Sequence, residues 1–462
     1  MNIHCFPKVV RLGAFLSLLA ALIAFAVRTA EAQVPTTPGP VTRLSLGDAA
    51  RLAAAQTAGV QSAEYRMQEA QARVGQARSQ FLPQIDATPN WTSHTINSAS
   101  FGFNFPAQPG QPPLLDPNGQ IIGPVRLYDL RASASQTLFN PGAAQQVRAA
   151  RAGVDAAGAD VATAASQAAT NAAAAYVRVV RADAALSARI ADSVLAADLL
   201  TIAREQLTAG VGVALDVTRA QSQLAGSRAQ LIAARNDRDR SRLDLLRSLN
   251  LPLETRLQLT DSLATLELPA AVDEAAAVDT AMRLRPEIRA ADLQLAAAQQ
   301  QIAAIRARGL PTVGVFGNDG PTGITPQHLL NTYTYGVQVN WSVFEGGRRE
   351  AQTQEQEAVA REIDVRRRDL RQQVQVDVRG AILDIASARE AVDAARERQR
   401  LAEQEVEQAR ERFRAGVAGN ADVITASLTL NTARTGLVDA LTAYQNARVS
   451  LARAEGTTSQ LR

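Results

Sequence analysis

The chain is poor in the residue types that most enzymes and metal proteins use. Its 462 residues include one cysteine, three histidines and three methionines, and aromatic residues make up only 4%. Because Cys5 lies at the extreme N-terminus, the remainder has no disulfide, thiol nucleophile or thiolate ligand. His94 and His328 have no carboxylate cluster at ligand spacing, and Gly210-x-Gly212 lacks the third glycine of a dinucleotide site. We therefore expect no cofactor, no metal and no catalytic residues.

The chain also has no large excess of positive or negative charge. The 48 basic and 45 acidic residues leave a net charge of +3, which is too small to attract nucleic acid. The sequence predicts no nucleic-acid partner.

The first 32 residues have the pattern of a secretory signal peptide. Lys8 and Arg11 form a basic region, Leu12–Val27 is apolar, and Ala30-Glu31-Ala32 is a cleavage site. Cys5 precedes the apolar region, so we do not interpret it as a lipid-attachment site. No later apolar stretch reaches 18 residues, so a mature protein embedded in a membrane would cross it with strands.

The rest of the chain is a tandem repeat. Glu205–Val217 aligns with Glu411–Val423 at an offset of 206, and Leu82-Pro83 aligns with Leu310-Pro311 at an offset of 228. The predicted organisation is a signal peptide at 1–32, a first repeat at 33–250, a linker at 251–270, a second repeat at 271–456 and a C-terminal tail at 457–462.

Alanine, which accounts for 90 residues, indicates long and closely packed helices. Ala143–Leu207 and Arg348–Phe413 contain no proline and carry a heptad register, with alanine at one of its two apolar positions. Spacing of this kind predicts coiled-coil packing. Each of these two long helical segments, called rods below, is followed by a turn that contains glycine and then by a returning helix. The rod and the returning helix together make a hairpin. The returning helices are expected at 215–249 and 422–454, and a third helical stretch is expected in each repeat, at 46–80 and 271–308.

Segments of alternating apolar and polar residues lie between the helices. Tyr333–Val343 and Tyr128–Leu138 show this period of two, at the length of tilted outer-membrane strands. The strand pairs are predicted at about 84–139 and 311–344, with irregular Pro- and Gly-rich loops at Phe105–Val125 and Gly317–Asn331. The competing interpretation is a half-buried sheet in a soluble protein. Four strands per chain cannot close a barrel alone, whereas two chains supply eight strands and three supply twelve, enough for a pore.

Several segments together resemble the TolC family of outer-membrane efflux proteins. They are Ala77–Asp86, Ser135–Phe139, Arg285–Ile288, Asn446–Ala452 and the paired Ala-Gly-Val turns. The resemblance covers roughly 44–456. It implies an α+β membrane protein: a homotrimer with a twelve-stranded barrel, four strands from each chain, joined to a periplasmic tunnel of long coiled-coil hairpins.

The resemblance also implies a location, partners and a function. The chain would lie in the outer membrane of a Gram-negative-type envelope, in contact with outer-membrane lipid, and extend into the periplasm. It would act as the channel of a tripartite efflux or type I secretion system, a passive exit duct joined to a periplasmic adaptor (membrane fusion) protein and an inner-membrane transporter. The sequence leaves the cargo open between drugs, metal ions and an unfolded polypeptide.

Acidic residues after each turn are the candidate pore residues. Asp216 and Asp422 are equivalent by the repeat and begin the returning helices, where a carboxylate is also favourable on helix-dipole grounds alone. The resemblance places Asp422 at the family's constriction. Thr425 stands where some members have a second aspartate, and Ala418 stands where some have a basic partner.

The turns themselves are the candidate docking sites for the adaptor. Gly210 and Val211 of the first repeat correspond to Gly416 and Val417 of the second. The simpler interpretation is that each glycine only terminates a helix. Two other protein classes remain as alternatives: a structural coiled-coil protein of the envelope without transport activity, and a periplasmic adaptor, which would carry one hairpin rather than two.

Overall fold

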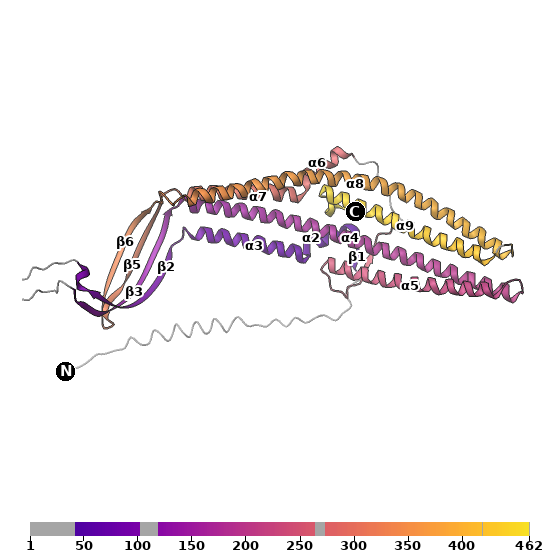
Figure 1. Ribbon diagram of the computed structural model, residues 1–462, viewed down its shortest axis with the longest axis horizontal. Helices are drawn as coiled ribbons and strands as arrows, with labels where there is room; N and C mark the ends of the chain where they lie inside the picture. The colour runs from indigo at the N-terminus through magenta and orange to yellow at the C-terminus, as the bar shows by residue number, and fades with distance from the viewer. Residues whose placement is uncertain (1–41, 102–118, 264–272, 418, 462) are drawn as a thin grey trace, which may run out of the picture.

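The computed structural model describes residues 42–101, 119–263, 273–417 and 419–461. The predicted signal peptide, Ala418 and most of the first predicted loop lie outside these ranges. The molecule is elongated, with a sheet at one end and two helical hairpins reaching to the other (Figure 1). The helices and strands are β1 (Thr42–Leu44), α2 (Leu46–Gln56), α3 (Ala58–Ser79), β2 (Gln84–Asn97), β3 (Ile121–Phe139), α4 (Pro141–Thr208), α5 (Ala214–Ser248), β4 (Leu257–Leu259), α6 (Glu274–Leu284), α7 (Pro286–Ala307), β5 (Thr312–Thr325), β6 (His328–Asn340), α8 (Arg348–Arg414) and α9 (Asn420–Glu455), with short 3-10 turns η1 (Ser98–Phe101) and η3 (Thr458–Gln460).

The two predicted rods are single uninterrupted helices. α4 has 68 residues and α8 has 67, so each is roughly 100 Å long at 1.5 Å per residue. α4 begins where the side chain of Asn140 accepts a hydrogen bond from the Ala143 amide, with proline at the first helical position. The heptad prediction is confirmed at the positions where alanine and valine alternate: the buried residues include Ala175, Val179, Ala182, Ala381, Ala388 and Val392. Small side chains at these positions let the helix backbones approach closely.

The third helical stretch of each repeat was expected to be continuous, and this expectation is wrong. The first is interrupted at Thr57, between α2 and α3, and the second at Arg285, between α6 and α7. The two breaks are equivalent at the offset of 228. In the second repeat the cause is Pro286, which disfavours helical backbone at the preceding residue. In the first repeat Thr57 takes the same extended conformation without a proline.

The four long strands form one antiparallel sheet in the order β2-β3-β5-β6. The predicted irregular loop at Gly317–Asn331 is wrong, because β5 continues to Thr325 and β6 begins at His328. Glycine and proline suggested a loop, yet glycine here allows close approach of strands. A Cβ on Gly320 would lie 2.2 Å from the Leu130 carbonyl oxygen, which no side chain could accommodate.

One face of this sheet is apolar and exposed in the single chain. The register aligns Ile85 with Ala134, Ala134 with Gly317, and Gly317 with Tyr335, so these residues share a face. Trp91 pairs with Tyr128 on the same face. Tyr335, Val337, Val339 and Trp341 continue it along β6 and beyond its end, all largely exposed. None of the described helices is both long enough and apolar enough to span a membrane.

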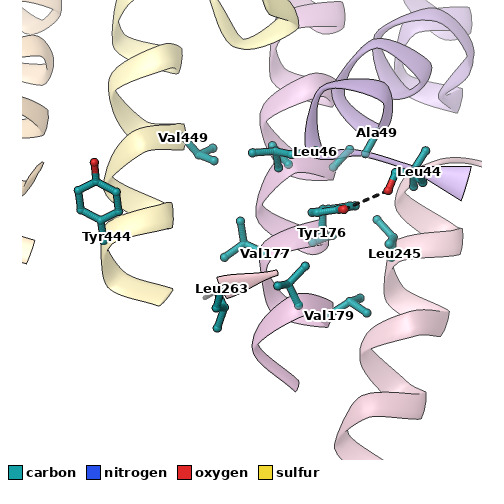
Figure 2. Packing of buried hydrophobic residues seen from close by; sticks show 14 of the residues in the cluster. Leu44, Leu46, Ala49, Tyr176, Val177, Val179, Leu245, Leu263, Tyr444 and Val449 are labelled. Carbon is teal, nitrogen blue, oxygen red and sulfur yellow. Dashed lines mark hydrogen bonds between the residues drawn. The ribbon is translucent and has the colours of Figure 1, made fainter. Parts of the chain in front are cut away.

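The main core lies midway along the helices, beside the chain's C-terminal end. Tyr176 of α4 is fully buried, and its hydroxyl donates a 3.0 Å hydrogen bond to the Leu44 carbonyl of β1 (Figure 2). Burial raises the pKa of Tyr176 far above its ordinary value, so the hydroxyl stays protonated. β1 pairs in parallel with β4 from the linker, a contact that the sequence did not predict. This core ties the start of the first repeat to the linker between the repeats.

Candidate functional site at the helix tips

Both hairpins end side by side, at the end of the molecule farthest from the sheet (Figure 1). Gly210 closes the α4–α5 turn with φ 74° and Gly416 closes the α8–α9 turn with φ 71°, values that favour glycine. The following amides complete equivalent caps: Val211 donates to the Gln206 carbonyl and Val417 to the Arg412 carbonyl, both at 3.0 Å. The two turns therefore have the same local structure, as the repeat predicts.

Apolar side chains are exposed at both tips. Val211 is 77% exposed and Val417 is 72% exposed, although valine is normally buried. A groove of about 530 Å³ separates the turns. Its lining includes Gln206, Gly212, Asp216, Phe413 and Gly419. An apolar tip beside a groove is a surface that another protein could cover.

Two side-chain amides link the hairpins near this groove. Gln206 Nε2 donates to the Phe413 carbonyl at 2.7 Å, and Asn420 Nδ2 donates to the Asp216 carbonyl at 2.8 Å. Asn420 is fully buried, and its Oδ1 has no partner in the described part of the chain. Sequence reasoning missed both amides. The available signal was asymmetry between the repeats, because Asn420 corresponds to Ala214 and Gln206 to Arg412.

The acidic candidates occupy equivalent backbone positions but different surroundings. Asp216 and Asp422 each lie in the first turn of a returning helix. Asp216 lines the groove with a side chain 19% exposed, and Arg219 Nη1 lies 3.9 Å from its Oδ1. Asp422 is exposed and lies outside the groove lining, and Thr425 is exposed with its hydroxyl donating to the Ala421 carbonyl at 2.9 Å. The structure thus brings Asp216, but not Asp422, to the space between the tips.

Residues with other chemistry are scattered. His94 and His328 are exposed on β2 and β6. Within the described ranges, no group of three or more His, Cys, Asp or Glu side chains is placed to hold a metal ion.

Comparison with known proteins gives one family. The sequence model described as "Outer membrane efflux protein" matches residues 49–251 and 277–457, which is most of the chain. No curated protein sequence matches significantly.

Several solved structures share the fold. The CmeC outer membrane channel of Campylobacter jejuni is 17% identical, with a TM-score of 0.71 over 89% of this chain and 86% of its own. VceC of Vibrio cholerae is 19% identical, with a TM-score of 0.68 over 89% and 96%. The MtrE outer membrane channel of Neisseria gonorrhoeae is 20% identical, with a TM-score of 0.67 over 89% and 88%. The predicted fold class, an α+β chain of long helical hairpins in two repeats with four strands in one sheet, is confirmed.

Proposed function

Because the chain belongs to the outer membrane efflux protein family, we propose that it is the passive exit duct of a tripartite efflux or type I secretion system. In this role it would receive cargo from an inner-membrane transporter through a periplasmic adaptor. The resemblance to the TolC family is confirmed. The protein is an outer-membrane efflux protein whose helices extend into the periplasm.

The observation that carries the proposal is the sheet with two free edges. β2 and β6 each pair on one side only, and the sheet face they share is apolar and exposed. Unpaired backbone groups in lipid cost several kcal/mol each, so the sheet must close with other copies. Eight strands from two copies would fill with side chains, whereas twelve from three leave a lumen. The trimer is therefore the assembly that makes a duct.

The tips supply the periplasmic entrance in this proposal. In a threefold ring each tip residue occurs three times, so Asp422 would form a ring of three carboxylates facing the lumen. Asp216 adds three more beside the groove, while Thr425 supplies no second charged ring one turn further on. The two amide links between the hairpins would keep the entrance narrow in the resting state.

The same tips would dock the adaptor. Gly210 and Gly416 build two equivalent turns that project Val211 and Val417 into solvent. Exposed valine side chains are more stable when a helical hairpin of another protein covers them than when they contact water. The barrel end, by contrast, presents its apolar band to outer-membrane lipid.

Channel activity separates this proposal from a structural coiled-coil protein of the envelope. The purified protein should conduct ions when inserted into a planar bilayer, and a strain lacking the gene should lose export of its cargo. Normal export in the deletion strain together with a non-conducting protein would overturn the proposal. A non-conducting wild type that conducts after the amide links are removed would instead show a closed duct.

A further inference from the structure

A buried ion cluster joins the two hairpins within one chain. The carboxylate of Asp192 on α4 has a side chain only 1% exposed. Its Oδ1 lies 2.8 Å from Arg434 Nη1 of α9, and its Oδ2 lies 3.2 Å from Arg189 Nη1. Arg189 also donates to the Thr435 hydroxyl at 3.1 Å. One carboxylate thus lies between two guanidinium groups, which is a strong arrangement for a planar oxyanion.

The repeat predicts a second junction of the same kind between copies. The offset of 206 carries α4 onto α8 and α9 onto α5. In one chain α4 packs on α9, and α5 and α8 are left at the two edges of the helical layer (Figure 1). In a closed ring, α8 of one copy therefore meets α5 of the next copy as α4 meets α9.

Side-chain exposure agrees with this second junction. Val177 of α4 is 3% exposed in the core cluster that also contains Val449 of α9 and Leu46 of α2, while its counterpart Leu383 of α8 is 70% exposed. Val449 of α9 is 4% exposed, while its counterpart Leu243 of α5 is 47% exposed. Apolar side chains at matching positions are covered at one junction and uncovered at the other, as expected if the next copy covers them.

The ion cluster is not repeated at this second junction, which is the seam between α8 of one copy and α5 of the next. Asp192 corresponds to Arg398, and Arg434 corresponds to Arg228, so the acid of the pair has become a base. Arg228 and Arg398 are both exposed, and neither forms an ion pair in the described part of the chain. The seam would therefore bring two guanidinium groups together without the carboxylate that joins the first junction.

The acidic neighbours of Arg398 on α8 are Glu397 and Glu405, which line one groove with it. The positions three and four residues from each arginine on its own helix are all apolar: Ala394, Ala395, Leu401, Ala402, Leu224, Ala225, Leu231 and Ile232. Glu397 is engaged by Arg400 on α8. The next acid on the seam side of α8 is Glu405, about two turns toward the tips, where its counterpart Leu199 is buried against α9 and α5.

We infer that Arg398 of one copy and Arg228 of the next form a binding site for a small oxyanion of the phosphate or sulfate class. The inference rests on the proposed trimer, which would contain three such sites. Two guanidinium forks can bind a tetrahedral oxyanion with parallel N–H···O bonds. At the first junction, Arg189 and Arg434 each donate one bond to the Asp192 carboxylate. The bound anion removes the like-charge repulsion of the seam and joins adjacent copies.

Cross-linking tests the placement of the two arginines. The only natural cysteine is Cys5 in the predicted signal peptide. In the double variant Arg228→Cys/Arg398→Cys, a short bismaleimide should therefore link copies into dimers and trimers on a denaturing gel. The matched pair Arg228→Cys/Arg396→Cys, with the second thiol on another side of α8, should link much less. A trimer by mass with no links in the first pair would overturn the inference, whereas absence of a trimer would overturn the proposed function.

Titration with inorganic phosphate tests the site itself. At constant ionic strength, the temperature at which the wild-type trimer dissociates should rise by several degrees, logarithmically once phosphate exceeds its Kd. The Arg398→Gln trimer should not show this rise, whereas the control Arg396→Gln should keep it. Without phosphate, the Arg398→Asp trimer should dissociate at a higher temperature than the wild type, because the new carboxylate forms a direct ion pair with Arg228 of the next copy. No rise in the wild type, or an equal rise in Arg398→Gln, would overturn the inference.

Discussion

Asn420 of α9 donates a hydrogen bond to the backbone carbonyl of Asp216 on α5, across the gap between the two hairpins. The bond is 2.8 Å long and the Asn420 side chain is fully buried, so water cannot easily replace it. Gln206 makes the matching contact from α4 to the Phe413 carbonyl at the end of α8. These two bonds, together with the burial of Phe413 and Val423 in one cluster with residues of α4 and α5, hold one hairpin against the other near the tips.

Removing both amides should open the entrance. Each lost bond removes an interaction worth about 0.5–1.5 kcal/mol to the closed arrangement, while both carbonyls keep a backbone donor. We expect Gln206→Ala/Asn420→Ala to raise single-channel conductance in planar bilayers well above the wild-type value. The control is Gln399→Ala, whose amide bonds only to Glu403 of its own helix. Equal conductance of the double variant and the wild type would show that other contacts close the entrance.

Asp422 should make the entrance cation-selective. A ring of three carboxylates concentrates cations and repels anions. Asp422→Asn should therefore shift the reversal potential in a salt gradient toward zero, more than Asp216→Asn does, because Asp216 already lies near Arg219. Unchanged ion preference in Asp422→Asn would mean that this residue faces away from the lumen.

Charge at the tip valines should abolish export. Val211→Glu/Val417→Glu places two carboxylates on a surface proposed to contact the adaptor, and their desolvation opposes docking. The valines are a cleaner test than the glycines, because any larger residue at Gly210 would be strained by its φ of 74°. Export should be lost while bilayer conductance and trimer mass stay unchanged. Full export by this variant would support the view that the turns only end the helices.

Tyr176→Phe should loosen the core between the repeats. The variant loses the bond to the Leu44 carbonyl, which keeps the Thr260 amide as a donor, and it removes the hydroxyl that accepts from the Asp261 amide at 3.3 Å. The part-buried Asp261 amide is left without that acceptor, which should lower the free energy of unfolding by about 1–3 kcal/mol. Thermal unfolding in detergent measures the change. Tyr65→Phe is the control, since Tyr65 is exposed on α3, and a similar loss in both variants would contradict this role for the Tyr176 hydroxyl.

The sequence predicts the structural elements that are repeated along the chain or that have a regular apolar period. Alanine at most positions spaced by seven residues predicts α4 and α8 to within a few residues, and the offset of 206 predicts two equivalent tips. By contrast, β1 and β4 are three residues each, and they are held by their own pairing and by contacts such as the Tyr176 hydrogen bond to Leu44. Asn420 could not be found from its own segment, since its partner lies 204 residues away in sequence.

Composition misled the prediction at β5. Gly317, Gly320 and Pro321 are typical of loops, but all three lie in β5. Gly320 allows the strand to pack closely beside Leu130, whereas a Cβ on Gly317 would meet no atom closer than 3.8 Å. The break at Thr57 has no local signal either, and only its equivalence to the proline-induced break at Arg285 could have suggested it.

Mass measurement of the detergent-purified protein decides whether three chains build the barrel, because a single chain has only half the strands of the smallest barrels. We predict a complex of three mature chains that stays intact at low protein concentration. A stable monomer, with its β2 and β6 edges unpaired, would contradict it.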